Sequence, residues 1–204
     1  SQGTVVATSV TIAFNWDMVS FIPLIGVGTA VTSLVGRYIG ARDLKTAHRS
    51  TRSALAIVLC YSVLLLIPFI FFTEGMVNIF HPSEASATFA EIHDLAVFMV
   101  RFIALYIITD AFVIVFSGAL RGAGDTFFTM LISACAHLAF ASSAFILLLG
   151  GTSAKTAWVV IIAIFLLIGP VFYIRYRTGH WKRNLSFIGT GDKTPEQILP
   201  EESQ

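Results

Sequence analysis

Charged residues are scarce in this sequence. Only 12% of its 204 residues are Asp, Glu, Lys or Arg, whereas 56% are hydrophobic and the mean hydropathy is +0.81. Soluble domains carry about 25% charged residues, and a soluble chain of this length could not enclose so much apolar surface in one core. The low charge therefore excludes a soluble globular protein and predicts an integral membrane protein.

Cysteines and catalytic motifs are scarce as well. The two cysteines, Cys60 and Cys135, lie in apolar runs, which argues against a disulfide framework or a metal site. We find no Gly-rich phosphate loop, catalytic triad or metal-ligand spacing, so we expect no enzymatic activity and no cofactor. The sequence lacks a charged segment before its first apolar run, so we expect no signal peptide. It begins in the middle of an apolar pattern, which we interpret as a fragment of a longer protein.

Long apolar runs define five predicted membrane spans. A helix needs about 20 apolar residues to cross about 30 Å of hydrocarbon. The predicted spans cover residues 4–36, 53–73, 95–120, 126–150 and 156–176. Because hydrocarbon offers no partner for unpaired backbone groups, these runs should be helices. We therefore predict an all-α integral membrane protein, with a transmembrane region at 1–177 and a flexible cytoplasmic tail at 178–204.

The end of the first span is rich in small residues. Gly26, Gly28, Gly36 and Gly40 should allow a neighbouring helix to approach closely. Pro23 lies within the same span and should kink it, because proline removes a backbone donor.

The connections between spans alternate in charge, which predicts an orientation. Of the 13 Lys and Arg residues, all except Arg101 and Lys155 fall on one side of the predicted topology. Cytoplasmic loops accumulate Lys and Arg. We therefore expect a multi-pass protein of the cell membrane, with its N-terminus outside and its C-terminus in the cytoplasm. The net charge of +1 gives no basis for a nucleic-acid partner.

The third predicted span contains an aspartate near its middle. Asp110 lies nine residues after Arg101 and eleven before Arg121, so a helix would place it near the bilayer midplane. A carboxylate at that depth costs at least about 2.5–3.5 kcal/mol, and such groups usually serve a substrate or ion path. Tyr106, Asp110, Ser117 and Arg121 share one helical stripe. We predict that Asp110 and Tyr106 bind a proton or a cation; the alternative is a protonated Asp110 that only bonds a neighbouring helix.

Three further polar residues are candidates for lining a cavity. Asp17 and Asn15 lie two residues apart in the first span, so a regular helix cannot turn both toward one cavity. His137 lies in the fourth span and could relay protons or bond a backbone carbonyl. We treat Asn15, Asp17, Ser117 and His137 as possible cavity-lining residues.

Two motifs resemble the multidrug and toxic compound extrusion (MATE) family. The first is PLIGVGTAVTSLVGRYIGA at 23–41, which resembles the cytoplasmic end of that family's eighth helix. The second is SGALRGAGDT at 117–126, which resembles the end of its tenth helix. Motif order, spacing and loop charge agree with the family over essentially the whole chain.

The resemblance implies a fold and a function. Members have twelve helices in two lobes and exchange organic cations for Na⁺ or H⁺. The five spans would be helices eight to twelve, embedded in the lipid bilayer and partnered by a missing N-terminal lobe. Asp110 and Tyr106 occupy the positions of the family's cation-binding Asp and of a Tyr four residues before it. Asp110 would bind Na⁺ in a sodium-coupled member. The acidic residue expected on the seventh helix is absent.

Two other functions remain open at this stage. Related folds include flippases for lipids or lipid-linked precursors, although such a cavity would favour Arg or Lys over Asp. The chain could also be a non-transporting fragment that serves as a packing partner.

Overall fold

The described part of the chain is a helical bundle without strands. In the computed structural model this part comprises residues 2–81, 87–179 and 181. The helices are α1 (Gln2–Gly40), α2 (Leu44–Phe71), α3 (Thr73–Asn78), α4 (Ala87–Gly122), α5 (Thr126–Leu149) and α6 (Ala154–Thr178). All except the short α3 are long and apolar enough to cross a membrane. The predicted all-α membrane fold with five spans is confirmed.

Some helices extend beyond the predicted apolar runs. α4 begins at Ala87 rather than near 95, because its first turns carry polar residues that hydropathy does not count as membrane-embedded. The short α3 was not predicted. Of the predicted tail, only residues 178, 179 and 181 are described, and Trp181 is 2% exposed. The remaining tail residues lie outside the described part.

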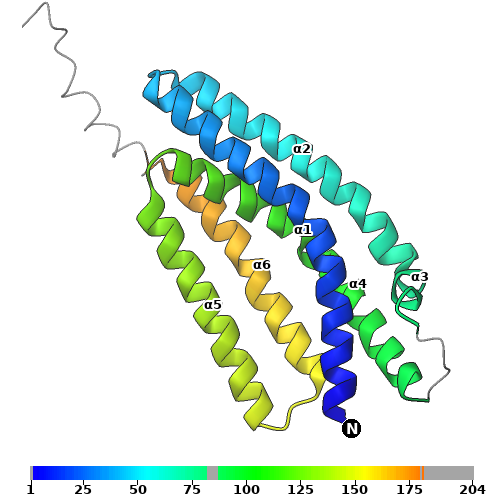
Figure 1. Ribbon diagram of the computed structural model, residues 1–204. Coiled ribbons are helices and arrows are strands. Elements are labelled where there is room, and N and C mark those ends of the chain that lie inside the picture. Colours follow the sequence, from blue (N-terminus) through cyan, green and yellow to red (C-terminus); the bar gives the residue numbers. More distant parts are fainter. Residues whose placement is uncertain (1, 82–86, 180, 182–204) are drawn as a thin grey trace, which may run out of the picture.

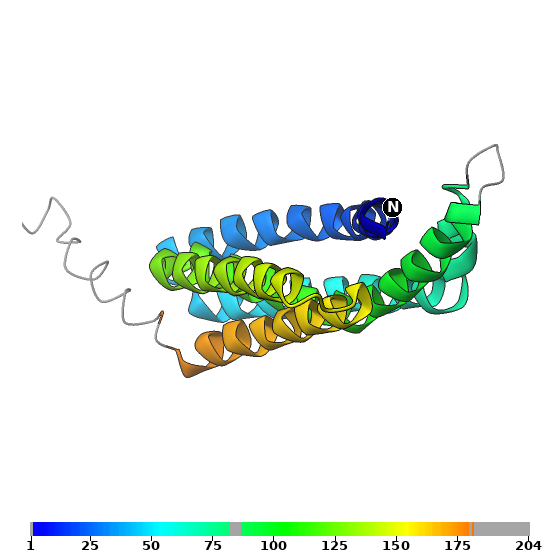
Figure 2. The ribbon, with the colours of Figure 1, turned by 90° about the horizontal axis from the view of Figure 1, so that it is seen from below.

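Helix α4 is the centre of the bundle. It packs against α1, α2, α3, α5 and α6, and half of its most apolar window is buried. Figure 1 shows α1 and α2 side by side as antiparallel neighbours, with α5 at the opposite edge. In the view of Figure 2, α1 and α6 lie on opposite sides of α4. Any group on the inner face of α4 is therefore shielded from several directions.

Helices α1 and α4 are in close contact through glycines. A Cβ atom added to Gly122 would lie 2.5 Å from the carbonyl oxygen of Thr32, and one added to Gly118 would lie 2.8 Å from that of Gly28. The Thr32 hydroxyl lies 3.1 Å from the Gly118 carbonyl oxygen, to which it donates a hydrogen bond between the helices. The expected close approach is therefore made by Gly28 and Gly36, whereas Gly26 and Gly40 face open space.

The sharp turn between α1 and α2 ends in a helix cap. Arg42 has a φ of +60°, which reverses the chain, and Asp43 is the N-cap of α2. The Asp43 carboxylate accepts hydrogen bonds from the Thr46 hydroxyl at 2.5 Å and the Thr46 amide at 2.9 Å. These bonds, led by the hydroxyl, hold the pKa of Asp43 below its usual value because they favour the charged form. Figure 1 shows α1 changing direction near its middle, and this helix contains Pro23.

Two separate apolar cores lie along the bundle. One contains Ile12 and Ala13 of α1 and Ile107 of α4, and the other contains Leu24 of α1 and Ala111 of α4. Asp17 and Asp110 fall between these residues along their helices. The division between the cores therefore coincides with the level of the intramembrane carboxylates.

Candidate functional site

A cavity of about 280 Å³ lies at the level where the two apolar cores meet. Helices α1, α4, α5 and α6 all contribute to its wall. Most of the lining side chains are aromatic or aliphatic, and four are polar or ionisable. These four are Asp17, Tyr106, Asp110 and His137. The structure thus brings together four of the six residues that the sequence singled out.

Tyr106 joins α4 to α1 across this cavity. Its hydroxyl donates a hydrogen bond of 2.6 Å to a carboxylate oxygen of Asp17. The Tyr106 ring is 8% exposed and stacks on Phe165 of α6, with 5.8 Å between ring centroids. Because the ring is held by packing, the phenol oxygen is fixed in place. Sequence spacing could not reveal this bond, since its partners are 89 residues apart.

Asp110 lies one turn after Tyr106 on α4 and lines the same cavity. Its carboxyl group makes no hydrogen bond or ion pair with any described residue. No buried side-chain oxygen in the described part is left without a partner, so the Asp110 oxygens retain surface that faces the cavity. Asp110 therefore has free ligand positions, whereas one oxygen of Asp17 is already used.

His137 enters the cavity from α5. Its Nδ1 lies 2.7 Å from the backbone oxygen of Ser133. A carbonyl oxygen can only accept, so Nδ1 carries the proton and Nε2 of the neutral ring is left as an acceptor.

The other two candidates lie elsewhere. Asn15 is exposed, and its amide donates to the backbone oxygen of Thr11 on the same helix. Ser117 is buried and lines a separate hollow of about 350 Å³ at the end of α4, together with Arg121 and Thr129. The stripe that joins Tyr106 to Arg121 along α4 is therefore divided between two hollows.

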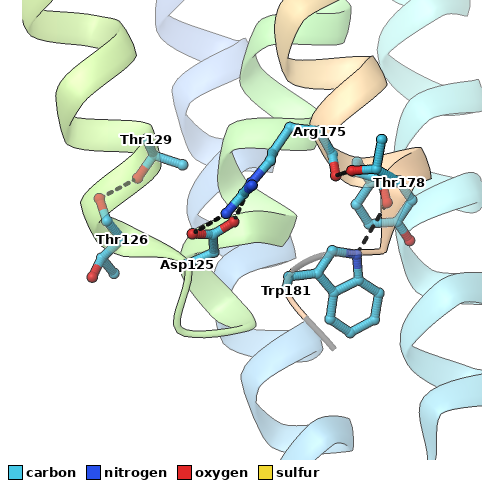
Figure 3. Close-up of polar contacts among 7 residues, drawn as sticks. Asp125, Thr126, Thr129, Arg175, Thr178 and Trp181 are labelled. Carbon is cyan, nitrogen blue, oxygen red and sulfur yellow. Dashed lines mark hydrogen bonds and ion pairs between the residues drawn. The ribbon is translucent and has the colours of Figure 1, made fainter. Parts of the chain in front are cut away.

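An ion pair that the sequence did not predict fastens the ends of three helices. Arg175 of α6 donates two hydrogen bonds to Asp125, at 2.8 and 3.2 Å, in the turn between α4 and α5 (Figure 3). The Asp125 side chain is 7% exposed, and the guanidinium lies 4.4 Å from the ring centroid of Phe128. Next to it, the Trp181 indole donates to the backbone oxygen of Tyr176. These contacts hold the helix ends beside the hollow that contains Ser117.

The cavity offers hard oxygen ligands and groups that exchange protons. When both are ionised, its two carboxylates repel each other across the apolar interior. A cation or a proton that enters would relieve this repulsion, and carboxylate and phenol oxygens suit hard cations. Within the described residues, no group of three or more His, Cys, Asp or Glu side chains could hold a metal ion. The carboxylate and phenol oxygens of this cavity can each contact a cation or exchange a proton.

Comparison with known proteins gave one family match and several relatives. The family model described as MatE matches residues 2–146. The chain is 30% identical over 122 residues to a probable multidrug resistance protein NorM of Thermotoga maritima, covering 60% of this chain and 25% of that protein. It is 31% identical over 124 residues to the multidrug resistance protein MdtK of Proteus mirabilis, covering 61% and 26%.

A third relative is equally distant. The multidrug resistance protein NorM of Aliivibrio fischeri is 28% identical over 123 residues, which cover 60% of this chain and 25% of that protein. The chain thus aligns with about a quarter of the length of each of these curated relatives. No solved structure matched it.

Proposed function

Because this chain belongs to the MatE family, we propose that it is the C-terminal part of a secondary antiporter that exports organic cations in exchange for Na⁺ or H⁺. Three relatives carry the name multidrug resistance protein, which supports an exporter of this kind. An N-terminal lobe would complete the transporter and enclose the substrate path. The N-terminus of this chain would lie outside the cell and its basic C-terminal end in the cytoplasm.

One observation carries the proposal. Asp17, Tyr106, Asp110 and His137 come from three different helices and line one cavity inside an otherwise apolar bundle. Ionisable groups within a membrane are costly, and their convergence on one cavity is typical of ion and proton paths. A purely structural Asp110 would need a hydrogen-bond partner on a neighbouring helix, and no described residue supplies one.

In this mechanism, Asp110 is the exchanging group. Tyr106 holds Asp17 in a fixed position, while the free Asp110 carboxyl binds Na⁺ or a proton from the cavity. His137 supplies a second proton-accepting nitrogen beside the cavity. A ligand drives the transporter between two conformations only if it binds one of them more tightly. Binding at Asp110 would favour one facing of the lobes, and its release would favour the other.

The size of the cavity favours the coupling ion over the exported compound as its occupant. Pockets for drug-sized ligands occupy about 300–1,000 Å³, and this cavity, at about 280 Å³, is no larger than the smallest of them. We therefore assign the coupling cation to the cavity. The organic cation would bind beside it, between the lobes, where the 44% exposed ring of Phe14 offers an aromatic surface.

The flippase alternative receives less support. A cavity for anionic head groups needs cationic side chains, and none of the described residues that line this cavity is Lys or Arg. Asp17 and Asp110 would instead repel a phosphate group.

The test is a pair of matched substitutions on α4 in the transporter with both lobes. Asp110→Asn removes the ionisable carboxyl with little change in volume, and we expect it to abolish coupled efflux of a fluorescent cation. Asp94→Asn is the control, because Asp94 lies on the same helix with its side chain 85% exposed. Efflux should be unchanged in the control. Normal coupled efflux by a well-expressed Asp110→Asn variant would refute the assigned role.

A further inference from the structure

The start of α2 carries a cluster of three cationic side chains. Lys45, Arg49 and Arg52 follow one another at spacings of four and three residues, so they share one face of the helix. They line a hollow of about 680 Å³ together with His48 and Ser53. None of the three forms an ion pair with a described residue.

An apolar groove between α1 and α2 adjoins this cluster. The groove measures about 580 Å³, and buried Val31 and Ala54 contribute to its lining. Small residues on both helices leave it open, among them Gly26 and Ala30 of α1. Arg49 lines both the groove and the cationic hollow, so the two spaces meet at its side chain.

The position of the cluster along α2 matches the boundary of a bilayer. Arg52 is the last charged residue before the apolar run that continues to Phe71. The groove starts beside Thr46 and Arg49 and extends into that run as far as Ile57, one turn beyond Ser53. A molecule that fills both spaces must therefore have an anionic group at the membrane surface and an apolar chain directed toward the membrane interior.

We propose that this combined site binds an anionic phospholipid. Its phosphate would contact Arg49 and Arg52, and one acyl chain would lie in the groove beside Ala30. Basic pockets between membrane helices recognise anionic head groups, and each basic side chain near the surface contributes to that attraction. A zwitterionic lipid is attracted less strongly to the arginines, because its ammonium group cancels the phosphate charge. The proposal does not depend on transport or on Asp110.

The experiment compares lipid affinities of the purified 204-residue chain in detergent micelles by native mass spectrometry. Phosphatidylglycerol and phosphatidylcholine with identical acyl chains are the probes, and sn-glycerol 3-phosphate serves as the head group without chains. We expect phosphatidylglycerol to bind most tightly, and its advantage to shrink as salt rises. The double substitution Arg49→Gln, Arg52→Gln should lower the affinity for phosphatidylglycerol about 25-fold. This is about fivefold for each arginine, which corresponds to about 1 kcal/mol of binding free energy each. Its effect on phosphatidylcholine should be small.

Two further variants test the head-group and chain assignments. Arg121→Gln removes an exposed arginine outside the site and should leave both lipid affinities unchanged. Ala30→Phe fills the groove without changing any charge and should lower the affinity for phosphatidylglycerol. Ile22→Phe lies on the exposed face of α1 and should leave this affinity unchanged.

Several outcomes would overturn the proposal. The unmodified chain would bind the two lipids equally well. Alternatively, the double variant or Ala30→Phe would bind phosphatidylglycerol as tightly as the unmodified chain. Binding of sn-glycerol 3-phosphate as tightly as phosphatidylglycerol would identify a site for soluble anions instead. Loss of chain self-association in Ala30→Phe, with lipid affinity unchanged, would identify the groove as a protein contact.

Discussion

A single methyl group at Gly122 should separate α1 from α4. Its Cβ would lie 2.5 Å from the Thr32 carbonyl oxygen, whereas ordinary contacts begin near 3.4 Å. Because the obstacle is backbone, no side-chain rotation can relieve it. The helices must therefore move apart locally by about 0.9 Å. A movement of that size would carry the 3.1 Å bond from Thr32 to the Gly118 carbonyl beyond hydrogen-bonding distance.

The expected change in the free energy of unfolding combines two destabilising contributions and one stabilising contribution. Overpacking a well-packed contact costs about 1–3 kcal/mol, and an interhelical hydrogen bond in a membrane protein is worth about 0.6 kcal/mol. Replacing glycine by alanine within a helix stabilises the helix by about 1 kcal/mol. We expect Gly122→Ala to lower the free energy of unfolding by about 0.6–2.6 kcal/mol net.

Gly26→Ala is the matched control. Gly26 lies within α1, but no atom lies within 4 Å of its added Cβ, so only the gain in helix propensity remains. The two variants should therefore shift the unfolding midpoint in opposite directions. The measurement is unfolding in mixed micelles with increasing SDS, followed by the fluorescence of Trp16 and Trp158, which pack against the first apolar core. Equal stability of the two alanine variants would refute the close glycine contact.

Three further predictions concern individual polar contacts. Tyr106→Phe removes the 2.6 Å bond to Asp17 and keeps the ring, so we expect a loss of about 1 kcal/mol in the same unfolding assay; an unchanged midpoint would contradict the bond. Asp125→Asn should cost about 2 kcal/mol, less than the roughly 3–5 kcal/mol for breaking a fully buried pair, because Arg175 is 26% exposed and keeps some contact with water. If Asp125→Asn lowered the free energy of unfolding far less at high salt than at low salt, the pair would be exposed to solvent instead. The pKa of Asp43 is lowered in the folded chain, so its capping contribution should be complete above the ordinary carboxyl pKa and should disappear as pH falls through the folded value. The protection factor for amide hydrogen exchange at the first turn of α2, corrected for the intrinsic pH dependence of exchange, should therefore fall in acid, and Asp43→Ala should remove this fall.

The fold was predictable because bilayer thickness sets the length of a spanning helix. Five charge-poor runs were enough to place the five long helices. The short α3 and the first turns of α4 could not be found this way, since neither is a long apolar run. Their helical form depends on tertiary contacts, including the packing of α3 on α4.

The candidate site was predictable only in part. The expected midplane position of Asp110 rests on its distance to the flanking charges Arg101 and Arg121 in a regular helix. Which polar residues share a cavity depends on helix rotation, and the sequence alone could not choose between Asp17 and Asn15. Periodicity correctly indicated that both could not face it. The pairing of Asp125 with Arg175 joins residues 50 apart and depends on how three helix ends meet.

The bond between Tyr106 and Asp17 has a consequence for biogenesis. Asp17 belongs to α1, whereas its phenol partner is translated 89 residues later, after α2 and α3. The Asp17 carboxyl group therefore lacks its partner until α4 emerges from the ribosome. During that time the carboxyl is protonated in the lipid, or α1 is held at the bilayer surface. Docking of α4 is then the step that commits α1 to its final depth, and mutations that delay α4 should leave the nascent chain exposed to membrane quality control.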